Sequence, residues 1–144
     1  MAFDIRFVGE EFEEEGQRLR QIMLTIGSFK ESIDADMTHW SIGDYRDQWM
    51  NELRKVIGPP AKGALITSLP DPNFAYRVNT WPMWREGDEI FFQSRLGGML
   101  EPYPRFQLDR LDEFIGERMR VNEDGVAISE WSVPMSEVVA FINR

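Results

Sequence analysis

The chain has 144 residues and a formal net charge of −9, with 42% hydrophobic and 28% charged residues. This length fits one ordinary domain that buries about two thirds of its unfolded surface, and the composition is close to the average of soluble globular proteins. The acidic balance disfavours binding to free nucleic acid, and the absence of cysteine excludes disulfides and thiolate metal ligands. No apolar run is long enough to span a bilayer, and the acidic N-terminal sequence does not resemble a secretory signal, so we expect a cytoplasmic protein.

The first elements expected along the chain are β-strands. A short strand is predicted over residues 3–8, and the acidic segment 9–17, with five glutamates, is predicted to be a flexible, solvated loop. Strands over 21–26 and 29–37 are expected to pair through a turn at residues 27–28, because apolar and polar residues alternate regularly in the second of them.

The strongest pattern predicts a helix from Ile42, in which apolar residues recur at i, i+3 and i+4 until Gly58 and two prolines end it. The remaining predicted elements are strands at 64–69, 74–81 and 89–95, a hairpin turn at 85–88, and helices at 108–115 and about 134–142. Pro82 indicates an edge strand or a bulge. Strands and helices are mixed without regular βαβ alternation. The chain is therefore expected to be a single α+β domain, with about three helices and a mainly antiparallel β-sheet, as one sheet or two packed sheets.

The segment THWSIGDYRDQW (38–49) combines residue types that are common in active sites, but helix initiation explains most of them. Ser41 as the N-cap and Asp44 three residues later have the spacing of a capping box. Trp40 before the cap and Tyr45 within the helix have the spacing of a hydrophobic staple. These four residues are therefore interpreted as structural.

No enzymatic motif accompanies His39, which is the only histidine. The chain has no G-x-S-x-G, no H-E-x-x-H, no P-loop and no G-x-G-x-x-G, and it has no cysteine nucleophile. We therefore expect no enzyme, no catalytic residues, no cofactor and no metal site. An enzyme that depends on His39 and has diverged beyond any motif is the remaining alternative of this class.

Two motifs, taken with their order and spacing, resemble a family of immunity proteins from bacterial contact-dependent growth inhibition systems. The first is W-x-x-x-D-Y-x-x-x-W, formed by Trp40, Asp44, Tyr45 and Trp49, and the second is GVAISEWSV at 125–133, with a helix after it. The resemblance runs from about residue 21 to the C-terminus and leaves the first twenty residues outside.

The resemblance implies a non-enzymatic protein that binds and neutralises a cognate toxin domain, the C-terminal region of a large secreted effector. Toxins of these systems are commonly nucleases, which carry basic surfaces, and an acidic inhibitor suits such a target. The oligomeric state is left open. The alternative from another class is a small nucleic-acid-binding or regulatory domain whose sheet aromatics, among them Trp81, Trp84, Phe91 and Phe92, stack bases.

The residues shared with the family are expected to form the scaffold, whereas partner contacts are expected at exposed, variable positions. The predicted structural residues are Trp40, Ser41, Asp44, Tyr45, Trp49, Trp81, Ser129, Glu130 and Trp131. The predicted partner-binding residues are Lys30, Ser32, Asp34, Asp36, Glu86 and Asp88. Strand alternation places Glu130 on the face opposite Trp131, and we expect it to be a buried, paired carboxylate that holds the sheet to a helix.

Overall fold

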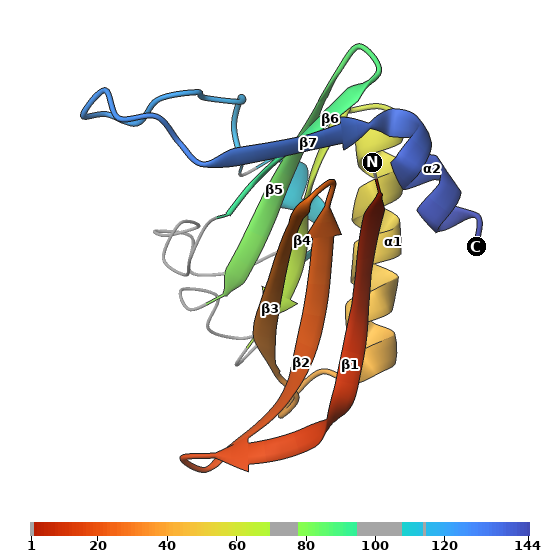
Figure 1. The fold of residues 1–144 in the computed structure, drawn as a ribbon, viewed down its shortest axis with the longest axis vertical. Helices are drawn as coiled ribbons and strands as arrows, with labels where there is room; N and C mark the ends of the chain where they lie inside the picture. Colours follow the sequence, from red (N-terminus) through yellow and green to blue (C-terminus); the bar gives the residue numbers. More distant parts are fainter. Residues whose placement is uncertain (1, 70–77, 95–107, 114) are drawn as a thin grey trace.

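The structure, a computed structural model, describes residues 2–69, 78–94, 108–113 and 115–144. Its strands form two antiparallel sheets, ordered β1-β2-β3 and β4-β5-β6-β7, with α1 packed beside them (Figure 1). The elements are β1 (Phe3–Glu14), β2 (Gln17–Ile26), β3 (Phe29–Asp36), α1 (Ile42–Ile57), β4 (Lys62–Ser68), β5 (Asn79–Glu86), β6 (Glu89–Gln93), the 3-10 helix η2 (Leu108–Glu113), β7 (Glu130–Pro134) and α2 (Met135–Ile142). The predicted α+β class with antiparallel sheets is confirmed.

One cluster of buried apolar side chains joins both sheets and α1 into a single core. Phe3 of β1 stacks on Phe92 of β6, with ring centroids 5.2 Å apart, and Phe7 of β1 stacks on Trp49 of α1 at 5.4 Å. Such aromatic pairs bury large areas and fix the relative orientation of the elements that carry them. The first sheet is thus packed against the second sheet and against the helix at once.

The edge of β4 that faces away from β5 is hydrogen-bonded by side chains of α1. The Gln48 amide donates to the Ala64 carbonyl oxygen at 2.8 Å and accepts the Ile66 N–H at 2.9 Å, so it acts like a peptide group of a neighbouring strand. The Glu52 carboxylate accepts the Ala64 N–H at 3.0 Å, and the Trp49 indole donates to the Ile66 carbonyl oxygen at 2.7 Å. These contacts satisfy buried backbone groups that would otherwise be costly to remove from water.

Tyr45, on the same face of α1, links the two sheets. Its hydroxyl accepts the Leu69 N–H at 3.0 Å, just beyond β4, and donates to the Asp36 carbonyl oxygen at the end of β3, at 2.6 Å. The Asp36 N–H in turn donates to the Ser68 hydroxyl at 3.1 Å. The end of β3 is therefore fixed to the end of β4.

Pro82 lies in β5, which is an interior strand between β4 and β6, so the prediction of an edge strand is wrong. Pro82 pairs with Ala64, whose N–H and C=O both point away from β5 to side chains of α1. This makes Ala64 and Pro82 a non-hydrogen-bonded pair, in which a missing N–H costs nothing. On the side of β5 that faces β6, strand pairing begins at Met83, so Pro82 lies outside that ladder. The irregular register between β4 and β5 lies further along, between Ile66 and Ser68.

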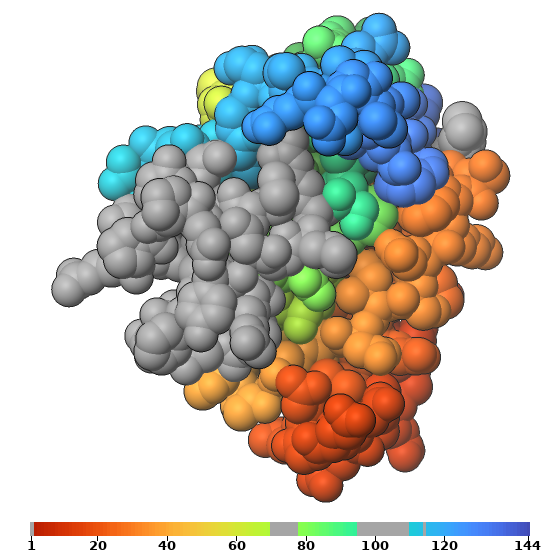
Figure 2. All heavy atoms as spheres, turned by 90° about the vertical axis from the view of Figure 1, so that its left-hand side faces the viewer, coloured from red at the N-terminus to blue at the C-terminus, as the bar shows by residue number. Residues whose placement is uncertain are grey.

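Residues 9–17 were expected to form a loop, but β1 continues to Glu14 and forms a hairpin with β2. The ladder shifts register between Val8 and Phe12, and a turn with positive φ at Glu15 and Gly16 closes it. Every residue from 9 to 18 is exposed, and the tip projects at one end of the molecule (Figure 2). The acidic composition reflects this solvent exposure, whereas backbone pairing still makes the segment a strand.

The other predicted elements agree with the structure to different degrees. The helices over 42–57 and 134–142 are confirmed as α1 and α2, and the predicted hairpin turns lie between β2 and β3 and between β5 and β6. The helix expected at 108–115 is only a 3-10 helix, interrupted by non-helical dihedral angles at Arg110. Of the strand expected at 74–81, residues 74–77 lie outside the described residues. Among the described residues, no helix is long and apolar enough to cross a membrane.

The Gln48→Leu variant tests the contact between α1 and β4. Leucine keeps a similar volume but leaves the Ala64 C=O and the Ile66 N–H buried without partners, so we expect a loss of about 2–5 kcal/mol in the free energy of unfolding. Urea denaturation measures it. Asn51→Ala, at an exposed position of the same helix, is the control and should shift stability by less than about 0.5 kcal/mol. Equal midpoints for the two variants would contradict the role given to Gln48.

Candidate partner-binding surfaces

A polar groove runs beside β3, between the two sheets, with a volume of about 320 Å³. Four consecutive residues of β3, 31–34, line one side of it, and Thr67, Asn79, Thr80, Trp81 and Ser94 line the other. Figure 2 shows this face, where the β2–β3 hairpin (orange) lies beside the part of β5 that is drawn in green. Two predicted partner-binding residues, Ser32 and Asp34, belong to this groove.

The six predicted partner-binding residues do not form one patch. Lys30, Ser32 and Asp34 are exposed on β3, whereas the β5–β6 turn, which carries the other two exposed residues Glu86 and Asp88, lies at the far end of the second sheet (Figure 1). Glu86 is also ion-paired with Arg118.

Asp36 is not available to a partner, so this prediction is wrong. It is only 5% exposed, and its carboxylate accepts the Thr38 N–H at 2.8 Å. The end of β3 turns into the core, since Ala35 and Met37 are buried as well, and the in-and-out alternation of the strand therefore stops before Asp36.

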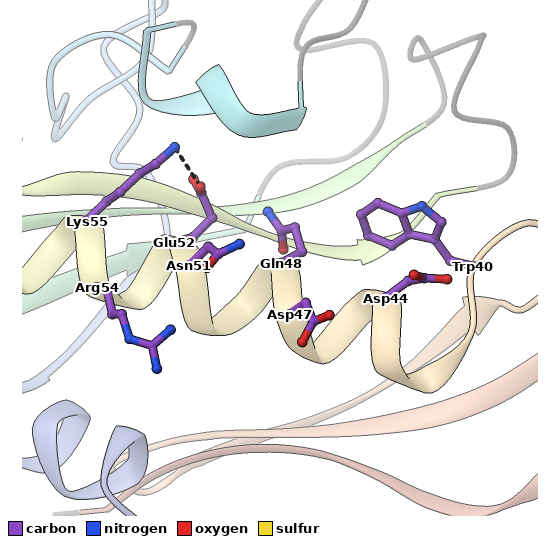
Figure 3. Close-up of a pocket in the computed structure, with 8 residues that line it drawn as sticks. All are labelled: Trp40, Asp44, Asp47, Gln48, Asn51, Glu52, Arg54 and Lys55. Carbon is purple, nitrogen blue, oxygen red and sulfur yellow. Dashed lines mark ion pairs between the residues drawn. The ribbon is translucent and has the colours of Figure 1, made fainter.

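A second groove, of about 470 Å³, follows α1 (Figure 3). It is lined by Trp40, Asp44, Asp47, Gln48, Asn51, Glu52, Arg54 and Lys55. In Figure 3, Gln48, Glu52 and Lys55 rise from one side of the helix, whereas Asp47 and Arg54 point away from them. Because Gln48 and Glu52 already bind β4, the exposed side chains left for a partner at the rim are those of Asp44, Asp47, Asn51 and Arg54.

A buried ion pair closes one end of this groove. Glu52 is 1% exposed, and its carboxylate lies 2.9 Å from the Lys55 ammonium, which also contacts Asp112 of η2 at 3.1 Å. Burial raises the pKa of Glu52, and the hydrogen bonds from Lys55 and from the Ala64 N–H oppose that rise. The pair joins α1, β4 and η2, which is a structural role.

The residues of the first sequence motif make the contacts that helix initiation requires. The Ser41 hydroxyl accepts the Asp44 N–H at 3.2 Å, and the Asp44 carboxylate accepts the Ser41 N–H at 2.9 Å, so the predicted capping box is present. Trp40 meets Tyr45 edge-on, with centroids 5.0 Å apart, at the spacing predicted for a hydrophobic staple. His39 is exposed.

Glu130 of the second motif is a paired carboxylate, as predicted, but it is half-buried where full burial was expected. Its oxygens accept two hydrogen bonds from the Arg118 guanidinium, at 2.5 and 2.8 Å, and one from the Gln93 amide at 2.9 Å. Arg118 also lies 3.6 Å above the Phe91 ring. Arg118 lies in the segment between η2 and β7, so Glu130 holds the sheet to this segment and not to a helix. The hydrogen bonds from Arg118 lower the pKa of Glu130.

The tryptophans of the second sheet are packed, which contradicts the alternative of a base-stacking platform. Trp81 and Trp84 are each 3% exposed and Phe92 is fully buried. Trp131 stacks on Phe29 at 4.0 Å, and Trp81 lies 5.6 Å from Trp131. This cluster attaches the β2–β3 hairpin to the second sheet. Ser129 is exposed just before β7.

Comparisons with known proteins cover nearly the whole chain. The model of the CdiI N-terminal domain family matches residues 35–141. The chain is 26% identical over 139 residues to the immunity protein CdiI of Enterobacter cloacae subsp. cloacae, which covers 96% of this chain and 95% of that protein. A solved structure, the CdiA-CT/CdiI toxin and immunity complex from Enterobacter cloacae, matches with a TM-score of 0.90 and 25% identity over 99% of this chain and 97% of the other. The likeness therefore extends into the first twenty residues.

The Glu130→Gln variant tests the ion pair with Arg118. We expect a loss of about 1–3 kcal/mol in the free energy of unfolding near pH 7, because the amide cannot replace a charge-assisted, two-point contact. Since the folded-state pKa of Glu130 is below its ordinary value of 4.5, this stabilisation is complete above pH 4.5 and is lost as the pH falls through the lowered pKa.

The measurement is urea denaturation of both proteins between pH 3 and pH 8, with exposed Glu123→Gln as the control. The difference between the wild type and Glu130→Gln should shrink on acidification. A variant as stable as the wild type at pH 7 would contradict the structural role of Glu130.

Proposed function

This chain belongs to the CdiI N-terminal domain family, and we propose that it is an immunity protein that binds a toxin domain and holds it inactive. The observation that carries the proposal is the match of almost the complete fold to a chain of a solved toxin and immunity complex. The relative from Enterobacter cloacae subsp. cloacae that matches 96% of this chain is itself an immunity protein. Such a protein acts by binding and needs no catalytic group.

The partner we propose is the cognate toxin domain, the C-terminal region of a large secreted effector of a contact-dependent growth inhibition system, and its activity is that of a nuclease. The net charge of −9 supports this choice, because nucleases carry basic surfaces for the phosphate backbone and opposite charges speed association. Bound in the cytoplasm, the protein would cover the active site, or bind beside it and exclude nucleic acid by bulk and like charge.

The division between buried and exposed residues supports a shared scaffold with a variable surface. Tyr45 and Trp49 of the first motif are buried and hydrogen-bonded to backbone groups, so changes there would disturb the fold. Lys30, Ser32 and Asp34 are exposed and can differ between relatives at little cost to stability. A toxin recognised through such positions would be bound by its own immunity protein only.

Co-expression with the C-terminal domain of the large secreted protein encoded immediately upstream tests this function. We expect a stoichiometric complex on affinity purification through a tag on the toxin domain, and restored growth of cells that the toxin domain alone inhibits. The toxin domain of an unrelated effector is the matched control and should neither co-purify nor be neutralised. A toxic domain that neither binds this folded protein nor is neutralised by it would contradict the proposal.

The nuclease part is tested with the same purified components. The toxin domain alone should cleave RNA or DNA, and cleavage should stop when the protein is added at equal concentration. Association should slow as salt is raised, because the attraction between opposite charges is screened. If the toxin domain is neutralised but cleaves neither RNA nor DNA, the proposed nuclease activity is contradicted and the proposed immunity function still stands.

A further inference from the structure

The backbone of β3 points alternately toward β2 and away from the sheet. A two-residue turn closes the hairpin at the pair Ile26 and Phe29, so the odd-numbered residues of β3 exchange hydrogen bonds with β2. The even-numbered residues then direct their N–H and C=O groups outward. Asp36 follows this alternation, because its N–H donates to Ser68 and its C=O accepts from Tyr45, and both residues lie outside the first sheet.

These contacts satisfy only the last position of the β3 edge. The outward N–H and C=O groups of Lys30, Ser32 and Asp34 have no hydrogen-bond partner among the described residues. The edge of β4 differs, because side chains of α1 bind its outward groups. A row of unpaired backbone groups on an edge strand is a template for another strand.

The groove beside β3 follows this edge. Successive residues of a strand point to opposite faces, so a groove lined by all four residues 31–34 runs along the edge and not across one face. Its opposite wall offers the hydroxyl groups of Thr67, Thr80 and Ser94 and the amide of Asn79. An extended segment lying there would meet unpaired backbone groups on one side and polar side chains on the other.

The charged side chains around the two edges of the first sheet indicate which charge a segment bound at each edge should carry. Carboxylates of Glu31 and Asp34 line the groove at β3. The opposite edge, at β1, lies beside the guanidinium groups of Arg6, Arg46 and Arg144, with Asp4 between two of them. A basic segment is therefore attracted more strongly to residues 31–34 of β3 than to the start of β1, where these arginines lie, and exposed Lys30 is the one positive charge of β3 itself.

We propose that an extended, basic segment of the toxin domain adds as a fourth strand along β3, from Lys30 to Asp34. This inference rests on the proposed immunity function and names the surface that carries it. Main-chain hydrogen bonds to the outward groups of β3 supply affinity, and Glu31 and Asp34 favour basic side chains at neighbouring positions of the added strand.

Two variants at Ser32 separate backbone from side-chain recognition. Ser32→Pro removes the outward N–H and leaves the bonds that the neighbouring odd residues make to β2, and edge strands tolerate such a proline. Ser32→Ala removes the hydroxyl and keeps the N–H. With the purified upstream toxin domain as ligand, we expect the Kd of Ser32→Pro to be at least about tenfold weaker than that of Ser32→Ala, because a hydrogen bond is lost and the ring occupies its place.

The outcomes separate the two proposals. Equal Kd values for both variants, whether unchanged or equally weakened, would overturn strand addition while wild-type binding still supports immunity. No binding by the wild type would overturn both. If Ser32→Pro loses its fold, amide hydrogen exchange of the wild type decides: the amides of Ser32 and Asp34 should exchange at least about tenfold more slowly in the complex, and unchanged exchange there would overturn the inference.

Discussion

Helix α1 takes the place of a neighbouring strand along β4, and the rest of the structure depends on this contact. Tyr45, Gln48, Trp49 and Glu52 follow the i, i+3, i+4, i+7 spacing of one helix face, and each binds backbone groups of β4 or of the residue after it. The helix thereby closes one edge of the second sheet, places Phe7 against Trp49, and fixes the end of β3. It also explains how Pro82 fits an interior strand, since the paired position on β4 is bonded to the helix.

Elements that depend on local sequence could be predicted, and those that depend on tertiary contacts could not. The helix over 42–57, its capping box and the two-residue turns follow from side-chain periodicity and turn chemistry. Gln48 and Glu52 have the polarity of solvent-facing helix residues, and only the approach of β4 shows that they are buried. Segment 9–14 pairs through its backbone, which its acidic side chains do not reveal. Asp36 failed as a candidate contact for the related reason that the end of β3 turns inward.

The residues that stabilise the fold and the surface proposed for recognition lie on different parts of the molecule. The aromatic and acidic residues of the two motifs have structural roles. They cap α1, form the hydrogen bonds between Arg118 and Glu130, and pack the β2–β3 hairpin against the second sheet. The surface proposed for the toxin domain is formed by ordinary polar residues of one edge strand, where backbone groups would carry the interaction. Because backbone groups are the same in every sequence, specificity must come from the side chains beside them, such as Glu31 and Asp34. Under the proposed function, this arrangement would let relatives with the same scaffold bind different toxin domains.

Amide hydrogen exchange of the free protein tests most directly whether α1 acts as a strand for β4. The N–H groups of Ala64 and Ile66 are bound only by side chains of Glu52 and Gln48. If these contacts are part of the stable core, both amides should exchange only through global unfolding, as slowly as the amides that pair β4 with β5. Exchange of Ala64 and Ile66 as fast as that of the outward amide of Ser32 would show an open edge at β4 and contradict the account.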